Sequence, residues 1–511
     1  MRLVFGCLKL LMRLWKFRGV QLTGRSKHFM YKKRFEKFVL NGIFLPLVLI
    51  VYMSTVSFAI DYNDNDWRVH NGSGVSGQTD SYGDGYLDDF FHALNLVEKY
   101  FVKDLSEDTL LKNVIQKLVF VTPPYCQDNL VSIQNCPYDP RRCFSDSIMI
   151  VSTRCGYDPD KLSIKAMDML LRDIDPYSST LDSAMLNELK IASSGKFTGV
   201  GMVVGFRNGE YVVISPFDGS PAYRAGIRAG DKLLEIDGVS LHGLTLFEAL
   251  KMVRGPSGSE VRFKIKDPLT GKIHNVRLRR TLIKAPSVRS KLLSDNVGYL
   301  RIVNFQKDTR DEVLKAINRL RSVTHAGNLR GLILDLRDNP GGLLNEAIRI
   351  SDLFLKSGTI TSLRSRGSKL NREFLATGSG PFGSLPTIVL INHGTASASE
   401  ILAGALQNRA NTLIIGRRSF GKASVQDIFP IKPGLALRLT TAHYYTANGR
   451  DIVGAGIQPD VNISEELEKS RDRFVGTDLA RIGNDSEVKM ALEFLAPNRS
   501  GNSSNMFMNL F

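Results

Sequence analysis

A serine and a lysine that each follow a short apolar segment could together form an activated nucleophile. Residues 387–391 (TIVLI) have the length and apolar character of a buried strand, and small hydroxyl residues lead from there into an amphipathic helix. Ser397 therefore falls at a strand-to-helix turn, where the first N–H groups of a helix lack partners within the helix. A second apolar segment, residues 412–415, precedes the loop that carries Lys422. A hydroxyl and an amine on neighbouring loops can act as nucleophile and general base.

The sequence around the serine is more specific than the serine itself, which at a helix start is most often only an N-cap. Residues 394–400 read GTASASE and residues 419–422 read SFGK. This combination resembles the active-site segments of the tail-specific, or C-terminal processing, serine peptidases. The resemblance implies that Ser397 is the nucleophile, that Lys422 is the general base, and that Gln426 helps to orient the lysine.

The segment DLRDNPGG, which ends at Gly342, resembles another motif of the same family. The resemblance implies an oxyanion hole made of the Ala398 N–H and one glycine N–H, for which we favour Gly341 over Gly342. The alternative is that these glycines only allow entry into a helix. We expect Asp335 and Arg337 to form a structural pair, so Asp335 is not assigned to a catalytic triad.

One histidine is a rival base for the serine. His393 lies four residues before Ser397, but no histidine motif surrounds it, so we interpret it as a turn residue. Lysine needs a lowered pKa for this role, because its ordinary value of about 10.4 leaves little neutral amine at pH 7. Burial against apolar side chains would lower the pKa of Lys422, and Phe420 and Val425 are the local candidates.

Residues 197–288 show the pattern of a small, mostly β domain. The stretch SPAYRAGIRAGDKLLEIDGVSL within it resembles a bacterial PDZ domain. Such a domain adds a peptide as a strand to a sheet edge while successive N–H groups hold the terminal carboxylate. The alternative for the glycine-containing loop is a tight turn between strands. The residues that match the carboxylate loop are Gly199, Val200, Gly201 and Met202.

The N-terminal region predicts export. Residues 1–37 hold eleven Lys or Arg and one Glu, and residues 38–59 form a 22-residue apolar segment. Its strongest part, residues 43–53, is short beside the roughly 20 apolar residues of a membrane span. We interpret it as a signal peptide cut after Ala59, with Met30 as the true start. The alternative is an uncleaved membrane anchor, and either predicts a location in the periplasm or at the outer face of the inner membrane.

Four of the five cysteines cluster in a segment rich in Pro, Asn and Asp. Their gaps lack the C-x-x-C pairs of a zinc site. In an oxidising compartment, we expect two disulfides that staple a loop-rich insertion, and the sequence leaves all three pairings open. The four are Cys126, Cys136, Cys143 and Cys155.

Charge and composition narrow the class of protein. The chain has 511 residues, of which 43% are hydrophobic and 23% charged, as in globular proteins. Ten of its +16 net charges lie in residues 1–37, so a nucleic-acid partner has little support. No metal-ligand cluster or nucleotide motif appears, and we expect no metal and no cofactor.

The fold class expected is mixed α/β and α+β in several domains. Alternating strands and helices predict a layered α/β peptidase core, which we interpret as a crotonase-like ββα architecture. The expected parts are a basic segment (1–37), a signal peptide or anchor (38–59), a flexible linker (60–86), a helical region with the cysteine insertion (87–196), the PDZ domain (197–288), the peptidase core (289–463), and C-terminal helices with a disordered tail (464–511).

The family resemblance covers about residues 85–495 and implies an endopeptidase for exported proteins with apolar C-terminal tails. The apolar C-terminus at residues 508–511 also makes self-trimming an expectation. The membrane would be a partner only through an uncleaved anchor, and a homo-oligomer or an adaptor protein is left open. The alternatives are a catalytically silent PDZ scaffold of the cell envelope and an acyl-CoA hydratase-like enzyme. Intact serine and lysine motifs argue against the first, and export with a PDZ domain argues against the second.

Overall fold

The computed structural model describes residues 85, 87–122 and 139–496, except residues 208, 218, 229, 245, 269, 325–326, 369–370, 408, 410, 465–478 and 480–481. The basic segment, the apolar segment and most of the linker therefore lie outside the described residues, as do Cys126, Cys136 and a helix expected at 465–473. Within the described part, no helix has both the length and the apolar character that a bilayer crossing requires.

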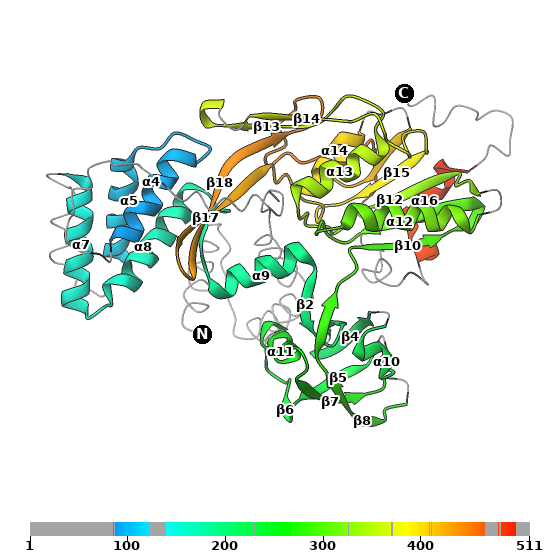
Figure 1. Cartoon of the computed structure of the whole chain (residues 1–511), viewed down its shortest axis with the longest axis horizontal. Coiled ribbons are helices and arrows are strands. Elements are labelled where there is room, and N and C mark those ends of the chain that lie inside the picture. The colour runs from blue at the N-terminus through cyan, green and yellow to red at the C-terminus, as the bar shows by residue number, and fades with distance from the viewer. Residues whose placement is uncertain are drawn as a thin grey trace, which may run out of the picture. The chain divides into compact units, whose positions relative to one another are not determined.

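Four helices pack side by side before the PDZ domain (Figure 1): α4 (Asp88–Tyr100), α5 (Glu107–Val121), α7 (Pro140–Cys155) and α8 (Pro159–Ile174). Helices α7 and α8 each begin with an aspartate N-cap followed by proline, the arrangement that satisfies a helix start and fixes its first φ angle.

Helix α7 corrects the expectation of a loop-rich cysteine insertion. Cys143 and Cys155 both lie on this helix, and Cys143 is buried beside Phe144, Ile148 and Val151. These apolar residues recur at helical spacing, but the polar residues between them hid the helix in the sequence.

A five-stranded antiparallel sheet joins segments that are far apart in the chain. It contains β1 (Ser179–Asp182), β13 (Thr359–Ser365), β14 (Arg372–Leu375), β17 (Ser424–Lys432) and β18 (Leu435–Tyr445). Strand β18 pairs with β17 along most of its length, with β1 at residues 435–438 and with β13 at residues 442–445. A strand that precedes the PDZ domain is therefore paired directly with a strand that follows the lysine loop.

The PDZ-like part follows helix α9 (Ser183–Ser194) and is enclosed by a two-stranded ribbon, β2 (Lys196–Gly199) and β9 (Thr281–Lys284). Its helices are α10 (Pro221–Arg224) and α11 (Leu246–Val253). Its strands are β3 (Met202–Arg207), β4 (Glu210–Pro216), β5 (Lys232–Ile236), β6 (Val239–Ser240), β7 (Glu260–Lys266) and β8 (Ile273–Arg279). In the described part of the chain, β3 pairs only with β4, so β3 is an edge strand of its sheet.

The region expected to form the catalytic core contains a six-stranded sheet in the order β10-β11-β12-β15-β16-β19. Strand β10 is antiparallel to its neighbour and the other pairs are parallel. The strands are β10 (Val288–Leu292), β11 (Val297–Ile302), β12 (Gly331–Asp335), β15 (Thr387–Ile391), β16 (Thr412–Gly416) and β19 (Val461–Asn462). The helices are α12 (Thr309–Ser322), α13 (Leu344–Phe354), α14 (Ala398–Leu406) and α16 (Ser486–Phe494).

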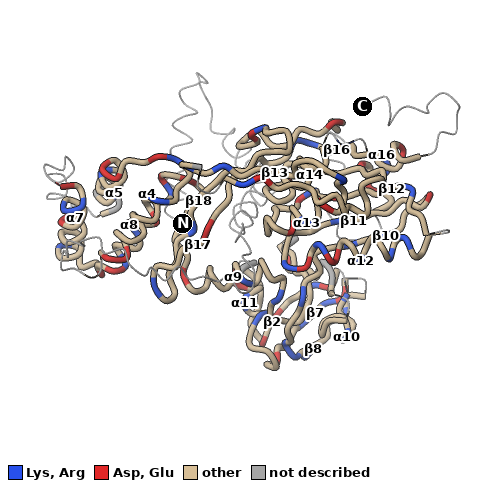
Figure 2. Tube along the Cα trace, turned by 45° about the horizontal axis from the view of Figure 1, so that its top comes forward, with Lys and Arg blue, Asp and Glu red and all other residues tan. Residues whose placement is uncertain are grey.

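Both faces of this sheet are covered, which explains its uninterrupted apolar strands. Leu332 and Leu334 pack into the core formed with α12, α13 and α14, whereas Ile333 between them packs with Val488 of α16. The structure thus confirms the expected mixture of helices and sheets. Figure 2 shows Lys and Arg interspersed with Asp and Glu along the described trace.

Candidate active site

The turn after β15 is fastened to the end of the neighbouring strand β12. The Asn392 N–H donates to Thr395 Oγ1 at 3.0 Å, and the Thr395 hydroxyl donates to the Leu336 carbonyl at 2.8 Å. The Gly394 N–H donates to Asn392 Oδ1 at 3.0 Å. These short polar side chains hold a tight turn that delivers the chain into α14.

Ser397 lies at the N-cap position of α14 in an unusual backbone conformation, with φ 60° and ψ −116°. Such a conformation costs a non-glycine residue of order 1–3 kcal/mol and is concentrated at functional sites. The side chain is only 1% exposed, and Oγ has no hydrogen-bond partner in the described part of the chain. A buried hydroxyl without a partner is unfavourable for stability and calls for a functional explanation.

Lys422 is 2% exposed on the loop before β17. Burial, and then the positive charge of Arg438, lower the pKa of its amine from 10.5 to about 7, while Asp175 and Glu400 act in the opposite direction. Its Nζ lies 4.6 Å from the centre of the Tyr177 ring, a cation–π distance. Lys422 is therefore neutral at a lower pH than an ordinary lysine.

The structure brings the main chains of the serine and lysine together without joining their side chains. The N–H groups of Ser397 and Lys422 donate to the same oxygen, Glu400 Oε2, at 2.7 and 2.9 Å. The two nitrogens thus lie no farther apart than the sum of those distances. The hydrogen bond that we expected between Ser397 Oγ and Lys422 Nζ is not formed. The lysine amine lies against the Tyr177 ring, on a flexible side chain that can rotate.

The glycine loop packs directly against the serine turn. Gly341 has φ 105°, and a Cβ at this position would lie 2.8 Å from the Ala396 carbonyl oxygen and 3.0 Å from the Ala398 nitrogen. Its N–H, the oxyanion donor that we favoured, donates to Asn339 Oδ1 at 2.9 Å. Gly342 follows at φ 142° with its backbone against Phe305. The expected donors therefore lie beside the serine, with the Gly341 N–H already engaged.

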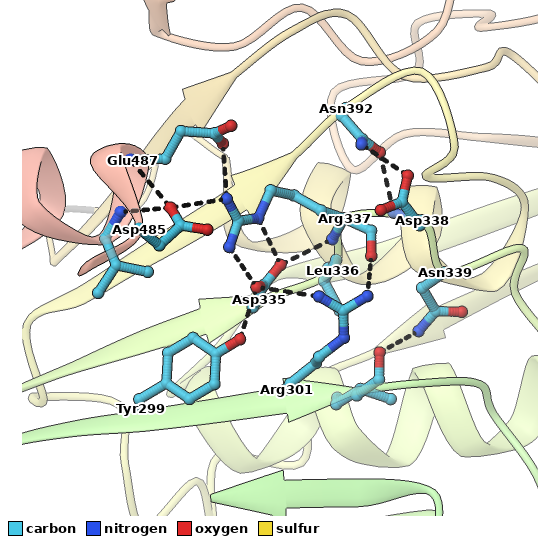
Figure 3. A network of polar contacts seen from close by, with 12 residues as sticks. Tyr299, Arg301, Asp335, Leu336, Arg337, Asp338, Asn339, Asn392, Asp485 and Glu487 are labelled. Atoms are coloured by element: carbon cyan, nitrogen blue, oxygen red, sulfur yellow. Dashed lines mark hydrogen bonds and ion pairs between the residues drawn. The ribbon is translucent and has the colours of Figure 1, made fainter. Parts of the chain in front are cut away.

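A buried ionic network holds the strand that leads into this loop (Figure 3). The Arg337 guanidinium binds Asp335 at 2.6 Å and, on α16 and its N-cap, Glu487 and Asp485 at 3.1 Å each. Arg301 binds Asp335 at 3.3 Å and donates to the Arg337 carbonyl at 2.9 Å. The expected pairing of Asp335 with Arg337 is thus present.

The Tyr299 hydroxyl adds a 2.7 Å bond to Asp335 in this network. The neighbouring arginines hold the pKa of the Asp335 carboxyl far below its usual range despite complete burial.

The other candidate residues occupy distinct places. Gln426 is buried on β17, where its amide nitrogen donates to Ser424 Oγ at 2.8 Å and to Thr440 Oγ1 at 3.3 Å. His393 is exposed on the turn, in contrast to the buried Ser397. The structure therefore places a buried lysine, rather than this histidine, in the same enclosed region as the serine.

The expected carboxylate loop connects β2 to the edge strand β3. The Val200 carbonyl accepts the Ala222 N–H, and the Gly201 carbonyl accepts the Ser220 hydroxyl at 2.8 Å. Gly201 has φ 73°, and a Cβ there would lie 2.4 Å from Ser220 Cβ. Both carbonyls thus bond into the domain, which fixes the loop beside the free edge of β3.

Sequence analysis missed four residues that contact or bias the site: Tyr177, Glu400, Arg438 and Tyr444. Glu400 belongs to the GTASASE motif, so the sequence gives its position in the motif. The sequence does not reveal its hydrogen-bond partners. Arg438 and Tyr444 follow only from the pairing of β18, which no local pattern revealed.

A buried serine on a strand-to-helix turn of an α/β sheet, beside a glycine loop and a buried amine, defines a serine hydrolase. The profile of peptidase family S41 matches residues 296–463, and that of a PDZ domain matches residues 212–267. The chain is 38% identical over 372 residues to the carboxy-terminal-processing protease of Bartonella bacilliformis. The aligned region covers 71% of this chain and 83% of that protein. It therefore belongs to peptidase family S41 and is a carboxy-terminal processing serine protease.

Two further proteins show the same similarity. The carboxy-terminal processing protease CtpA of Bacillus subtilis is 34% identical over 306 residues, or 60% of this chain and 64% of that protein. The structure of the photosystem II D1 C-terminal processing protease matches with 25% identity and a TM-score of 0.45, over 78% of this chain and 97% of that chain. The relatives from Bartonella bacilliformis and Bacillus subtilis are both named as proteases, so the alternative of a silent PDZ scaffold finds no support in them.

Proposed function

We propose that this peptidase cleaves exported proteins after recognising their apolar C-terminal tails, with Ser397 as nucleophile and Lys422 as general base. One observation carries the proposal. Two buried polar groups lie on segments whose main chains are adjacent, and the stability of the fold alone explains neither of them. They are a serine Oγ with no hydrogen-bond partner in the described chain and a lysine whose pKa is lowered to about 7.

The reaction begins when the Lys422 side chain rotates from the Tyr177 ring toward Ser397. Neutral Nζ takes the serine proton as Oγ attacks the peptide carbonyl. The Ala398 N–H and a glycine N–H hold the oxyanion, and Gly341 serves in this role only when Asn339 releases its N–H. The ammonium then protonates the leaving amine, and water attacks the acyl-enzyme with the neutral lysine again as base.

Tail recognition is assigned to the PDZ domain. Strand β3 has a free edge to which a peptide strand can add, and residues 199–202 lie at its start. Apolar residues of the domain core come close to this edge through the contact of α11 with β3. A peptide with a free carboxylate and apolar last residues fits both features.

We also propose export, with the chain in the periplasm or at the outer face of the inner membrane and the apolar segment removed after Ala59. The four clustered cysteines support an oxidising compartment. Cys143 and Cys155 lie twelve residues apart on α7, which separates them by roughly 18 Å. A disulfide needs Cα atoms about 4.4–6.8 Å apart. Each must therefore pair with Cys126 or Cys136, which reduces three pairings to two.

The domain boundaries and the crotonase-like architecture are proposed together. The start of the peptidase sheet at β10 (Val288–Leu292) supports a core beginning near residue 289. The combination of a parallel sheet, a second sheet and flanking helices supports the layered architecture. Residues 87–196 then form the helical region and 464–511 the C-terminal part.

The test is cleavage of an unfolded reporter protein that carries an apolar C-terminal tail. Wild-type enzyme should cleave it, whereas Ser397→Ala and Lys422→Ala should each lose at least a hundredfold in kcat, because general-base catalysis alone contributes about 10²–10⁴-fold. A reporter with an amidated C-terminus should be cleaved with a higher KM, because the PDZ loop would lose its carboxylate.

Two results would contradict the proposal separately. Full activity of Lys422→Ala would reject the lysine as base and return attention to His393. Equal KM values for the free and amidated tails would reject carboxylate recognition while leaving the catalytic assignment intact.

A further inference from the structure

Glu400 collects hydrogen bonds from two separate segments of the site. It is the third residue of α14 and fully buried. Its Oε1 accepts the Ser419 hydroxyl and, at 2.7 Å, the Gly421 N–H. Its Oε2 accepts the N–H groups of Ser397 and Lys422. A buried carboxylate needs such donors, and these four come from the serine turn and the lysine loop, while the Tyr444 hydroxyl lies 3.5 Å from Oε2 as a further donor.

Tyr444 joins the same two segments through their carbonyl groups. Its hydroxyl oxygen lies 2.6 Å from the Lys422 carbonyl oxygen and 3.0 Å from the Ser397 carbonyl oxygen. The ring is fully buried, and the Tyr444 N–H donates to the Ala423 carbonyl at 2.9 Å, which fixes β18 against the lysine loop. The hydroxyl is thus held between the two reacting residues by strand pairing.

The result is a clamp of two residues, Glu400 and Tyr444, that holds Ser397 and Lys422 by both N–H and carbonyl groups. Ser397 and Lys422 are 25 positions apart in sequence, and no strand pairing in the described part of the chain joins them directly. Ser397 also has a strained backbone that must be held by its surroundings. Capping of a helix start by Glu400 would require only its bond to the Ser397 N–H. A hydrogen bond from the buried Tyr444 hydroxyl would require only one of the two carbonyl groups.

We propose that Glu400 and Tyr444 are positioning residues, which set the register of the Ser397 main chain against the Lys422 main chain so that the amine can reach the hydroxyl. This inference rests on the proposed catalytic roles of Ser397 and Lys422. Neither positioning residue exchanges a proton with substrate. A displacement of about 1 Å between reacting groups can cost about a hundredfold in rate.

The test is Tyr444→Phe in the full chain, because it removes one hydroxyl and keeps the ring. With an internally quenched peptide substrate, we expect kcat to fall about ten- to a hundredfold with KM changed less than twofold. The rate is divided by the folded fraction from circular dichroism at the assay temperature. Glu400→Gln has the same shape and should lower kcat in the same direction, because an amide cannot accept from all four donors.

The matched control is Tyr211→Phe. Tyr211 is also a buried tyrosine whose hydroxyl donates to a carbonyl, that of Leu244 at 2.7 Å in the PDZ domain. It should lower the melting temperature about as much as Tyr444→Phe and leave kcat unchanged.

A kcat for Tyr444→Phe within twofold of wild type would overturn the clamp, as would an equal loss of kcat in Tyr211→Phe. The kcat of Glu400→Gln is calculated for the folded fraction alone. If Glu400→Gln does not fold, the result for Tyr444→Phe decides the test. Failure of the proposed function would look different, because Lys422→Ala would then remain active whatever Tyr444→Phe does.

Discussion

At the scale of single residues, the proposed chemistry depends on the protonation state of the Lys422 amine. Burial lowers the pKa of Lys422 to about 7, and the charge of Arg438 on β18 acts in the same direction. The negative charges of Asp175 and Glu400 act in the opposite direction and raise this pKa. The neutral Tyr177 ring lies against Nζ. The neutral form of this amine, which is the proposed base, should therefore become less available as pH falls.

We expect kcat/KM to fall as pH decreases through about 7, because the charged amine cannot accept the serine proton. Arg438→Gln should move this acid limb to higher pH by removing a positive charge near the amine. His443→Gln is the control, since burial also lowers the pKa of this half-buried histidine on β18. A limb that moves in His443→Gln and not in Arg438→Gln would contradict the assignment to Lys422.

The lowered pKa of Lys422 should also affect how the free energy of unfolding depends on pH. The folded chain binds fewer protons at Lys422 than the unfolded chain between about pH 7 and the ordinary pKa of 10.5, so this group makes the free energy of unfolding rise with pH across that window. Lys422→Met should remove that rise, which urea titrations at several pH values would measure.

The residues of the site were predictable to the extent that they lie in local motifs. Ser397 and Lys422 stood out because each follows a buried strand. The position of the lysine amine on Tyr177 was not predictable, because Tyr177 reaches the site through the pairing of β1 with β18. The engagement of the Gly341 N–H by Asn339 is likewise a matter of side-chain conformation.

At the scale of elements, α16 acts as a support for the glycine loop. Its N-cap Asp485 and its residue Glu487 place two carboxylates on the fully buried Arg337, which lies four residues before Gly341 in the sequence. These carboxylates lie outside the 296–463 range of the family match. The support for the glycine loop therefore comes in part from the proposed C-terminal part of the chain (464–511).

We expect Asp485→Asn to lower the free energy of unfolding by about 3–5 kcal/mol, the usual effect of breaking a buried ion pair. Asparagine keeps an N-cap for α16, so the loss reports on the charge. Thermal or urea unfolding measures it. The control is Asp108→Asn. The Asp108 side chain is 48% exposed and that of its partner Lys112 is 40% exposed, so this change should alter stability by less than about 1 kcal/mol. Equal losses in the two variants would contradict the role of the network.

The elements that sequence located best are those buried on both faces. The expected strand 387–391 matches β15, and the apolar segment 412–415 lies within β16. Helix α7 was missed because polar residues interrupt its apolar face, and the antiparallel strands β13, β14 and β18 were missed because their partners lie far away in sequence. Local periodicity carries no information on such long-range pairing.

At the scale of the whole molecule, the PDZ domain is an insertion between two strands of the catalytic layers, since β1 precedes it and β10 follows it. The cysteine-bearing helix α7 belongs to the part that precedes it. Peptide mapping without reductant should find Cys143 and Cys155 each linked to Cys126 or Cys136, because α7 keeps them too far apart to pair with each other. A Cys143–Cys155 peptide, or four free thiols in the exported protein, would contradict this prediction.

The late position of β18 and α16 has a consequence for synthesis. The PDZ strands lie together within one continuous stretch of the chain, whereas Lys422, Tyr444 and Asp485 come after most of it has been made. A nascent or prematurely terminated polypeptide could thus hold a tail before it could cut one. Under the proposed assignments, hydrolysis therefore has to wait until the chain through Asp485 has been made.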